Sequence, residues 1–135
     1  MVIKPDLTGK VAIITGGGRG IGRAVALALA RCKASTIVTS RTLYEIEAVT
    51  TEIRKTNGKA LFVQCNIADE GQINRLFDKV MEKFGKLDII VNNAAIGRYG
   101  PVQNFTTCDL DDLIAVNIRG TYICCREALQ RMLPQ

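Results

Sequence analysis

Residues Thr15 to Gly22 read T-G-G-G-R-G-I-G and place five glycines within eight positions. The segment follows a short apolar run, V-A-I-I-T at 11–15, and precedes a stretch whose apolar residues recur with helical spacing. Gly16, Gly20 and Gly22 give the spacing G-x-x-x-G-x-G. Glycine permits positive φ in a tight turn, and the free N–H groups at the start of the next helix favour an anion. Between a strand and a helix, this spacing predicts a loop that binds the pyrophosphate of a dinucleotide.

Hydrophobic periodicity alternates between strand and helix along the chain. It predicts strands at 11–15, 36–40, 59–65 and 88–92, with helices between them and a last helix over about 108–133. Asn57-Gly58 and Gly85 are expected to end the second and third helices as left-handed caps. The helices are expected to pack through Ile21, Val25, Ala28, Leu29 and Cys32; through Leu43, Ile46 and Ile53; and through Ile73, Leu76, Phe77, Val80, Met81 and Phe84.

Strand–helix repeats joined by right-handed crossovers build a parallel sheet that is covered on both faces. We therefore predict an α/β, Rossmann-type doubly wound fold that forms one dinucleotide-binding domain over residues 1–135. The sheet is expected to be incomplete, with about four strands in the order 3-2-1-4.

Composition also indicates a single globular domain. The chain has 135 residues, of which 47% are hydrophobic and 23% charged, and this length is close to that of a typical domain. No apolar run approaches the roughly 20 residues that a membrane-spanning helix needs. The first residues, M-V-I-K-P-D-L-T-G-K, lack the basic and then apolar regions of a secretion signal. We therefore expect a soluble, cytoplasmic protein.

Charge and cysteine patterns narrow the function classes. Lys and Arg number 18 against 13 Asp and Glu, a net charge of +5, but bases and acids are interleaved as on ordinary solvated helix faces. We expect neither a nucleic-acid partner nor a membrane partner. We expect no metal site and no disulfide framework, because the chain has no histidine and no C-x-x-C spacing. Most cysteines are interpreted as small core residues: Cys32, Cys65, Cys108, Cys124 and Cys125, with one of the last two expected to be exposed.

The end of the second strand indicates which dinucleotide the loop binds. In such folds, an acidic residue about 20 positions after the glycine loop binds the ribose of NAD, whereas an arginine accommodates the 2′-phosphate of NADP. Ser40 stands where the acid is expected, Arg41 follows it, and Arg19 lies within the loop. Two guanidinium groups favour a phosphate dianion through charge-assisted hydrogen bonds. NADP(H) is therefore favoured over NAD(H); the alternative is that both arginines are ordinary surface residues.

Three motifs together resemble the short-chain dehydrogenase/reductase family, of the kind typified by 3-oxoacyl-carrier-protein reductases. They are T-G-G-G-R-G-I-G at 15–22, N-N-A-A at 92–95 and N-I-R-G at 117–120. The motifs occur in the family's order and in the expected elements, and the resemblance runs from about Leu7 onward. It implies an oxidoreductase that transfers hydride between NADP(H) and a small-molecule carbonyl or alcohol.

The resemblance also implies the cofactor-binding residues. They are Gly16, Gly18, Arg19, Gly20, Ile21 and Gly22 around the pyrophosphate and ribose; Ser40 and Arg41 at the 2′-phosphate; Asn66 and Ile67 at the adenine; and Asn93, Ala94 and Val116 on the adenosine-ribose side of the cleft. Thr15 resembles the threonine that ties the glycine loop to the N-N-A segment. Asn66 replaces a common aspartate, and its amide oxygen can still accept from the adenine amino group. Ala95 replaces the usual glycine.

Asn117 is the one residue of the family's catalytic set that the resemblance places in this chain. In the family it interrupts a long helix and holds a water on the proton relay to an active-site lysine. The alternative is an asparagine that kinks the helix through a local backbone bond. Residues 1–135 contain no Y-x-x-x-K motif, so we expect this chain alone to be inactive. Tyr122 lies four residues before Arg126, but arginine cannot act as the base, and we assign the pair no catalytic role.

Two apolar surfaces are expected to be open in this chain, and two other classes of function stay possible. Without a fifth strand, the apolar run 88–92 leaves an open sheet edge. In the family the last helix packs against its twin, which implies a homo-oligomer, a dimer or tetramer. The alternatives to half of a reductase are a noncatalytic dinucleotide-binding or partner-binding module, and a nucleic-acid binder with steeply salt-dependent affinity. The helix stripe expected to be exposed is Ile118, Tyr122, Cys125, Leu129 and Met132.

Overall fold

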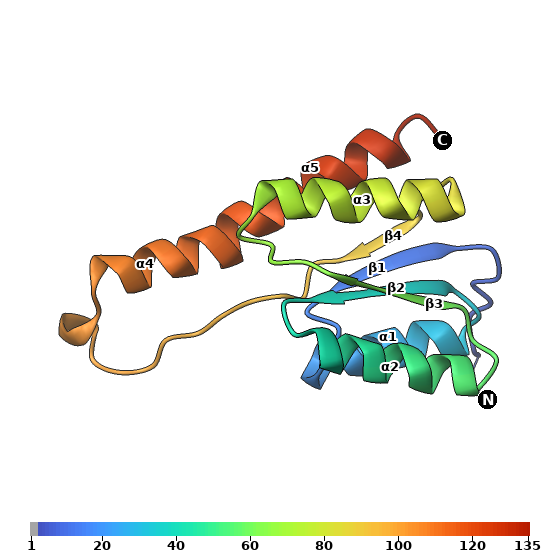
Figure 1. Cartoon of the computed structure of the whole chain (residues 1–135), viewed down its shortest axis with the longest axis horizontal. Helices are drawn as coiled ribbons and strands as arrows, with labels where there is room; N and C mark the ends of the chain where they lie inside the picture. Colours follow the sequence, from blue (N-terminus) through green and yellow to red (C-terminus); the bar gives the residue numbers. More distant parts are fainter. Residues whose placement is uncertain (1–2) are drawn as a thin grey trace.

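The computed structural model describes residues 3–135 and shows a four-stranded parallel sheet with helices on both faces (Figure 1). The strand order β3-β2-β1-β4 confirms the predicted α/β fold. The strands are β1 (Val11–Thr15), β2 (Ser35–Ser40), β3 (Ala60–Gln64) and β4 (Ile89–Val91). The helices are α1 (Gly20–Arg31), α2 (Leu43–Lys55), α3 (Glu70–Phe84), the short 3₁₀ helix η1 (Val102–Asn104), α4 (Thr107–Leu113), the π-helical η2 (Ile114–Gly120) and α5 (Thr121–Met132). Among the described residues, none of these helices combines the length and apolarity required to cross a bilayer.

The sheet separates two apolar clusters because alternate residues of a strand point to opposite faces. Val11 and Ile13 of β1 contact the cluster under α3 and α5, whereas Ala12 and Ile14 contact the cluster over α1 and α2. All five residues of β1 are buried, as expected for a strand covered on both sides. The carboxyl ends of β1, β2 and β3 consequently meet at one edge of the sheet, where the glycine loop begins.

Helix α1 packs only partly through the predicted face. Val25 and Leu29 are half-buried and pack against the apolar cluster, as predicted, but Ile21 is 77% exposed and Ala28 is also exposed. The fully buried residues of α1 are instead Gly22 and Ala26. The apolar spacing correctly indicated a helix, but it did not reveal that these two small residues are the most buried ones. Leu43, at the start of α2, is likewise more exposed than predicted, at 40%.

Both predicted left-handed caps are present. Asn57 has φ 60° and follows α2, and Gly85 has φ 71° and ends α3. The apolar stripe of α3 is also confirmed, because Ile73, Leu76 and Phe77 are fully buried.

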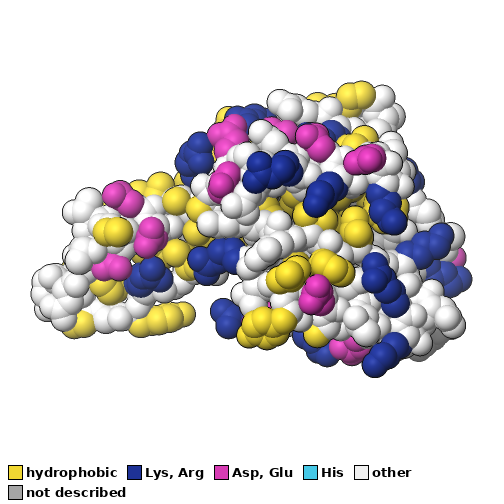
Figure 2. Space-filling view, in the orientation of Figure 1, with side chains coloured by type: hydrophobic (Ala, Val, Ile, Leu, Met, Phe, Trp, Pro, Cys, Tyr) yellow, Lys and Arg dark blue, Asp and Glu magenta, His cyan; other side chains and the backbone are white. Residues whose placement is uncertain are grey.

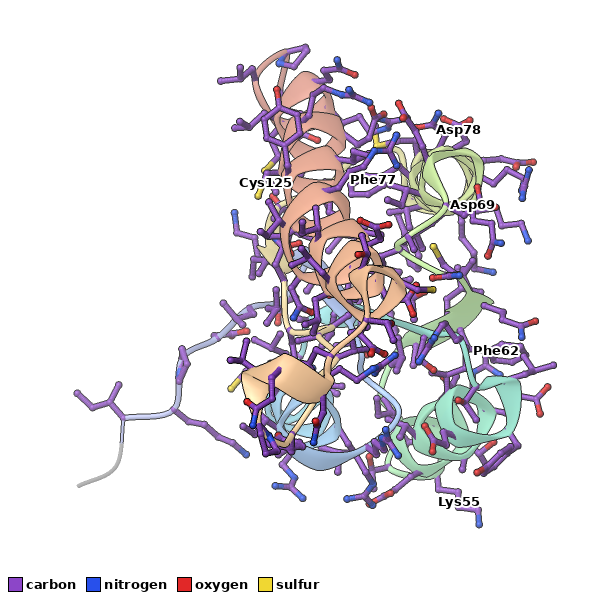
Figure 3. The ribbon with its side chains drawn as sticks, turned by 90° about the vertical axis from the view of Figure 1, so that its left-hand side faces the viewer. Lys55, Phe62, Asp69, Phe77, Asp78 and Cys125 are labelled. Carbon is purple, nitrogen blue, oxygen red and sulfur yellow. The ribbon has the colours of Figure 1, made fainter. Side chains whose placement is uncertain are left out.

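The last predicted helix is one continuous rod made of α4, η2 and α5. In Figures 1 and 2 its α4 end projects beyond the sheet, and Figure 2 shows a hollow between this projection and the body of the domain. Glu70 of α3 pairs with Arg119 and Arg126 at 2.9 and 2.8 Å, and Asp78 pairs with Arg131 at 2.8 Å. These ion pairs and the buried Phe77, which lies between α3 and the rod in Figure 3, attach the rod to α3.

The opposite face of the rod is open, as predicted for the apolar stripe. Ile118, Tyr122 and Leu129 are 64%, 66% and 52% exposed. Cys125 and Met132 are half-buried, and Figure 3 shows Cys125 on the side of the rod that faces away from α3. β4 is an edge strand that pairs only with β1 among the described residues.

The cysteines only partly follow the interpretation as core residues. Cys65 and Cys124 are buried, Cys32 and Cys125 are half-buried, and Cys108 is exposed near the start of α4. Of the adjacent pair, Cys125 is therefore the more exposed, because a helix points neighbouring residues about 100° apart.

Candidate functional site

The glycine loop contains two backbone conformations that favour glycine. Gly16 has φ 62° and Gly20 has φ 56°, both in the left-handed region. Gly16 also lies under Ala94, where an added Cβ would be 2.9 Å from the Ala94 Cα. The loop therefore turns sharply from β1 into α1 while it touches the segment that follows β4.

Gly22 marks the closest approach in the loop. A Cβ at Gly22 would lie 2.2 Å from the Gly16 carbonyl oxygen and 2.4 Å from Nδ2 of Asn93. Neither neighbour can move away easily, because the first is backbone and the second is hydrogen-bonded on both sides. Because residue 22 has no side chain, the first turn of α1 can lie directly behind the loop.

Thr15 and Asn93 join the glycine loop to the segment after β4. Thr15 Oγ1 accepts hydrogen bonds from the backbone N–H groups of Asn93 and Ala94, at 3.1 and 3.0 Å, and donates to the Val91 carbonyl at 3.3 Å. The Asn93 side-chain amide donates to the carbonyls of Thr15 and Gly16, each at 3.1 Å. These bonds hold the loop in one position relative to β4, as predicted for Thr15.

A pocket of about 310 Å³ opens above this loop at the carboxyl ends of the strands. Every predicted cofactor-binding residue except Gly22 lines it; Gly22 lies behind the loop. A second hollow of about 180 Å³ shares Arg41, Asn66, Ile96 and Val116 with it and continues toward α4. The structure therefore brings together residues that lie up to 100 positions apart (Gly16 and Val116) in the sequence.

Ser40, Arg41 and Arg19 all line the pocket. Both arginines are exposed, and within residues 3–135 neither is in an ion pair. Ser40 Oγ accepts from the Thr42 N–H at 3.1 Å and donates to the Thr42 carbonyl at 3.2 Å. The guanidinium groups are therefore available to an anion, whereas the Ser40 hydroxyl has local partners.

Asn66 and Ile67 form the wall of the pocket after β3. Asn66 Oδ1 accepts from the Ala68 N–H at 3.0 Å, and the Asn66 N–H donates to Gln72 at 2.8 Å. Gly120, the last residue of the N-I-R-G motif, lies against this segment, since a Cβ there would be 2.6 Å from the Ile67 carbonyl oxygen. The motif's glycine therefore lets the rod approach the wall of the pocket.

Asn117 lies in the π-helical segment and binds the loop after β4. Its Oδ1 accepts from the Ile96 N–H and its Nδ2 donates to the Ile96 carbonyl, both at 2.8 Å. A π turn widens a helix by one residue and occurs mostly as a short insertion at functional positions. The predicted interruption of the long helix is therefore present. Asn117 itself lies outside the 310 Å³ pocket but holds Ile96, which lines it.

Tyr122 and Arg126 do not form a catalytic pair in this structure. Tyr122 is on the exposed face of the rod, whereas Arg126 binds Glu70 and Glu127. Hydrogen bonds to Glu70 and Glu127 raise the pKa of Arg126 above its ordinary value, so it stays a cation.

Two buried thiols lie near the pocket. Burial raises the pKa of Cys65 to about 11 and that of Cys124 to about 12. The thiolate is the reactive form of cysteine, so both side chains are inert core groups at neutral pH.

Comparison with known proteins identifies the family. The family model described as short chain dehydrogenase matches residues 10–135. This chain belongs to the short-chain dehydrogenase family. It is 38% identical to versicolorin reductase stcU of Emericella nidulans over 93% of this chain and 48% of that protein. It is 36% identical to trihydroxynaphthalene reductase of Colletotrichum orbiculare over 94% of this chain and 45% of that protein.

A solved structure of the same family supports the fold. A metagenomic short-chain oxidoreductase in complex with NADP superposes with a TM-score of 0.87 and is 33% identical, over 95% of this chain and 57% of that one. This short-chain dehydrogenase sequence thus spans about half the length of the curated relatives that it matches.

Some pocket residues were not predicted from the sequence. One of them is Glu45, which adds an acidic group to the pocket that Arg19 and Arg41 also line. Its signal was the T-x-x-E pattern at 42–45, directly after the second strand. The others are Thr39, Thr42, Cys65 and Ile96.

Proposed function

We propose that the chain forms the cofactor-binding half of a short-chain reductase or alcohol dehydrogenase that uses NADP(H). The observation that carries the proposal is that the pocket is lined by Arg19 and Arg41, two guanidinium groups without acidic partners among residues 3–135, and by Ser40 in place of an acid. A 2′-phosphate dianion suits this pocket because charge-assisted hydrogen bonds to guanidinium are short and strong. The NADP complex among the related structures supports the same preference.

The pocket suits the rest of a dinucleotide as well. Gly16 and Gly18 present backbone without side chains at the loop, so a pyrophosphate can approach the N–H groups at the start of α1. Asn66 Oδ1 has one hydrogen bond, from Ala68, and its second lone pair can accept from an adenine amino group. The bound nicotinamide would supply the hydride, and the residues of this chain would bind and orient it.

Asn117 has a positioning role in this proposal. Because both atoms of its side-chain amide bind Ile96, the side chain would act on the proton relay that the family resemblance implies only through the position of Ile96. The side chain then sets the position of the pocket wall at Ile96.

A small carbonyl or alcohol is the proposed substrate class.

We further propose a homo-oligomer formed through the rod. Its open face carries Ile118, Tyr122 and Leu129, each more than half exposed. Contiguous exposed apolar surface of this kind marks protein–protein contacts.

A nicotinamide fluorescence titration of the purified chain with NADPH and NADH tests the proposal. We expect tighter binding of NADPH, and we expect Arg19→Ala and Arg41→Ala each to weaken it about 10- to 100-fold while NADH binding changes little. Lys55→Ala removes a cation from the far end of α2 (Figure 3) and serves as the control with unchanged affinities.

Either of two results would contradict the proposal. Equal affinity for NADPH and NADH would refute the cofactor preference, and lack of binding to both would refute the cofactor-binding role. A model ketone in the same cuvette reports turnover. We expect none, and turnover would require Tyr122 to be reconsidered as the acid.

A further inference from the structure

Glu45 occupies a helix position where its usual partner is already bound elsewhere. The sequence Thr42-Leu43-Tyr44-Glu45 is a capping-box pattern, in which the glutamate carboxylate accepts from the N-cap N–H. At α2 no side-chain capping bond forms. The Thr42 N–H donates to Ser40 Oγ instead, at 3.1 Å.

Helix α4 shows what the same pattern does when it is complete. Thr106 Oγ1 accepts from the Asp109 N–H at 3.1 Å, and Asp109 Oδ2 accepts from the Thr106 N–H at 2.9 Å. Unlike Asp109, therefore, Glu45 does not accept a hydrogen bond from the N–H of its N-cap residue.

The carboxylate lies against the glycine loop instead. A Cβ at Gly18 would be 2.8 Å from Glu45 Cβ and 3.0 Å from Glu45 Oε2. Glu45 is half-buried, and within residues 3–135 its side chain has no ion pair or hydrogen bond. It therefore adds a negative charge, without an ion-pair partner among residues 3–135, to the pocket that Arg19 and Arg41 also line.

This charge has opposite consequences for the two dinucleotides. A carboxylate opposes a 2′-phosphate dianion in the same low-dielectric pocket by direct Coulomb repulsion. It accepts hydrogen bonds from the 2′- and 3′-hydroxyl groups of an unphosphorylated ribose, as the acid after the second strand does in NAD-binding folds.

Resting on the proposed function, we propose that Glu45 sets the cofactor specificity of this pocket by accepting from the ribose hydroxyls of NAD(H) and weakening the preference of Arg19 and Arg41 for NADP(H). When a 2′-phosphate binds, the Ser40 hydroxyl turns to donate to it and releases the Thr42 N–H. Glu45 can then accept from that N–H, which draws its carboxylate back from the phosphate but leaves its negative charge in the pocket wall. The two acceptors exchange one donor, so no backbone N–H loses its partner.

Adenosine 2′,5′-bisphosphate and 5′-AMP test the proposal, because they probe only the adenosine end of the pocket. Their affinities for the purified chain are measured by calorimetry at one ionic strength. We expect Glu45→Gln to tighten the bisphosphate about tenfold and to weaken 5′-AMP a few-fold. Glu47→Gln removes an exposed negative charge two residues further along α2. This control is expected to change both affinities less than about twofold.

Glu45→Asp tests whether the position of the negative charge matters, because this variant keeps the charge but places it on a shorter side chain. The shorter carboxylate suits the box, as Asp109 shows at α4, and its oxygen atoms lie one bond closer to the α2 backbone than those of Glu45. We expect this variant to tighten the bisphosphate as Glu45→Gln does, although net charge is unchanged. Circular dichroism of each variant confirms that the helices are retained.

The possible failures are distinguishable. If the unmodified chain binds neither probe, the proposed function is wrong and this inference with it. If it binds both but the ratio of the two affinities in Glu45→Gln stays within about twofold of the unmodified chain, or matches that in Glu47→Gln, the role of Glu45 alone is wrong.

Discussion

The glycine loop and the rod of α4, η2 and α5 differ in how completely their surroundings are filled. Within the loop, a Cβ at Gly22 would overlap the Gly16 carbonyl oxygen, and Thr15 is only 1% exposed. The rod is closed on the face toward α3, while Tyr122 on its other face is 66% exposed. Short contacts within the chain therefore restrict which residues fit at positions 15 and 22, whereas the open face of the rod has no such constraint.

The largest expected effect breaks the loop at its closest contact. Gly22→Ala places a methyl group 2.2 Å from the Gly16 carbonyl oxygen, and the required backbone shift should lower the free energy of unfolding by about 3 kcal/mol. Gly20→Ala is the control, because it has φ 56° but open space around its Cβ, and should cost only about 1 kcal/mol. Urea unfolding followed by circular dichroism measures both. Equal costs would show that the contact at Gly22 is easily relieved.

A smaller loss is expected when the loop keeps its shape but loses a hydrogen-bonding atom. Thr15→Val removes the acceptor of the Asn93 and Ala94 N–H groups, and these buried donors should cost about 2–3 kcal/mol of stability. Thr50→Val is the matched control, because Thr50 is buried in α2 and its hydroxyl has no partner within residues 3–135. It should raise stability by about 0.5–1 kcal/mol. A loss of stability in Thr50→Val would contradict this reasoning.

A still smaller loss of stability is expected when the contact between the rod and the segment after β4 is removed. Asn117→Ala removes both hydrogen bonds to Ile96 and should cost about 1–2 kcal/mol, since Asn117 is half-buried. Amide hydrogen exchange should accelerate at Ile96 more than in the buried strand β1. Asn104→Ala, an exposed asparagine in η1, is the control and should leave the exchange pattern unchanged. Uniform acceleration in Asn117→Ala would mean that the contact acts globally rather than locally.

The smallest effect on stability is expected on the open face of the rod. Leu129→Arg should change the free energy of unfolding by less than about 0.5 kcal/mol, because Leu129 is 52% exposed. It should nevertheless shift the chain toward the monomer in sedimentation velocity, since a charge there opposes apolar association. Gln130→Arg adds the same charge at the neighbouring exposed position and should leave association unchanged. An identical response of both variants would contradict the proposed interface.

Periodicity and turn residues were sufficient to predict the fold. The alternating pattern located all four strands to within one residue at either end, and the caps at Asn57 and Gly85 were placed correctly. These features are local, because side-chain alternation and positive φ depend on neighbours in the sequence. The contact face of α1 was only partly predicted, for a non-local reason: Val25 and Leu29 pack against the core as expected, but contacts with other segments bury Gly22 and Ala26 and leave Ile21 exposed.

The same distinction between local and non-local features applies to the candidate site. The glycine loop, the order of the strands and the family could be predicted from the amino-acid sequence, because those depend on residue types at fixed spacing; the roles of the cofactor residues and the cytoplasmic location stay predictions. The folded chain was needed to see that Glu45 lines the same pocket as Arg19 and Arg41, that Asn117 holds Ile96, and which side of the rod is open. Such contacts join residues from different elements, and their existence depends on packing distances that no local pattern encodes.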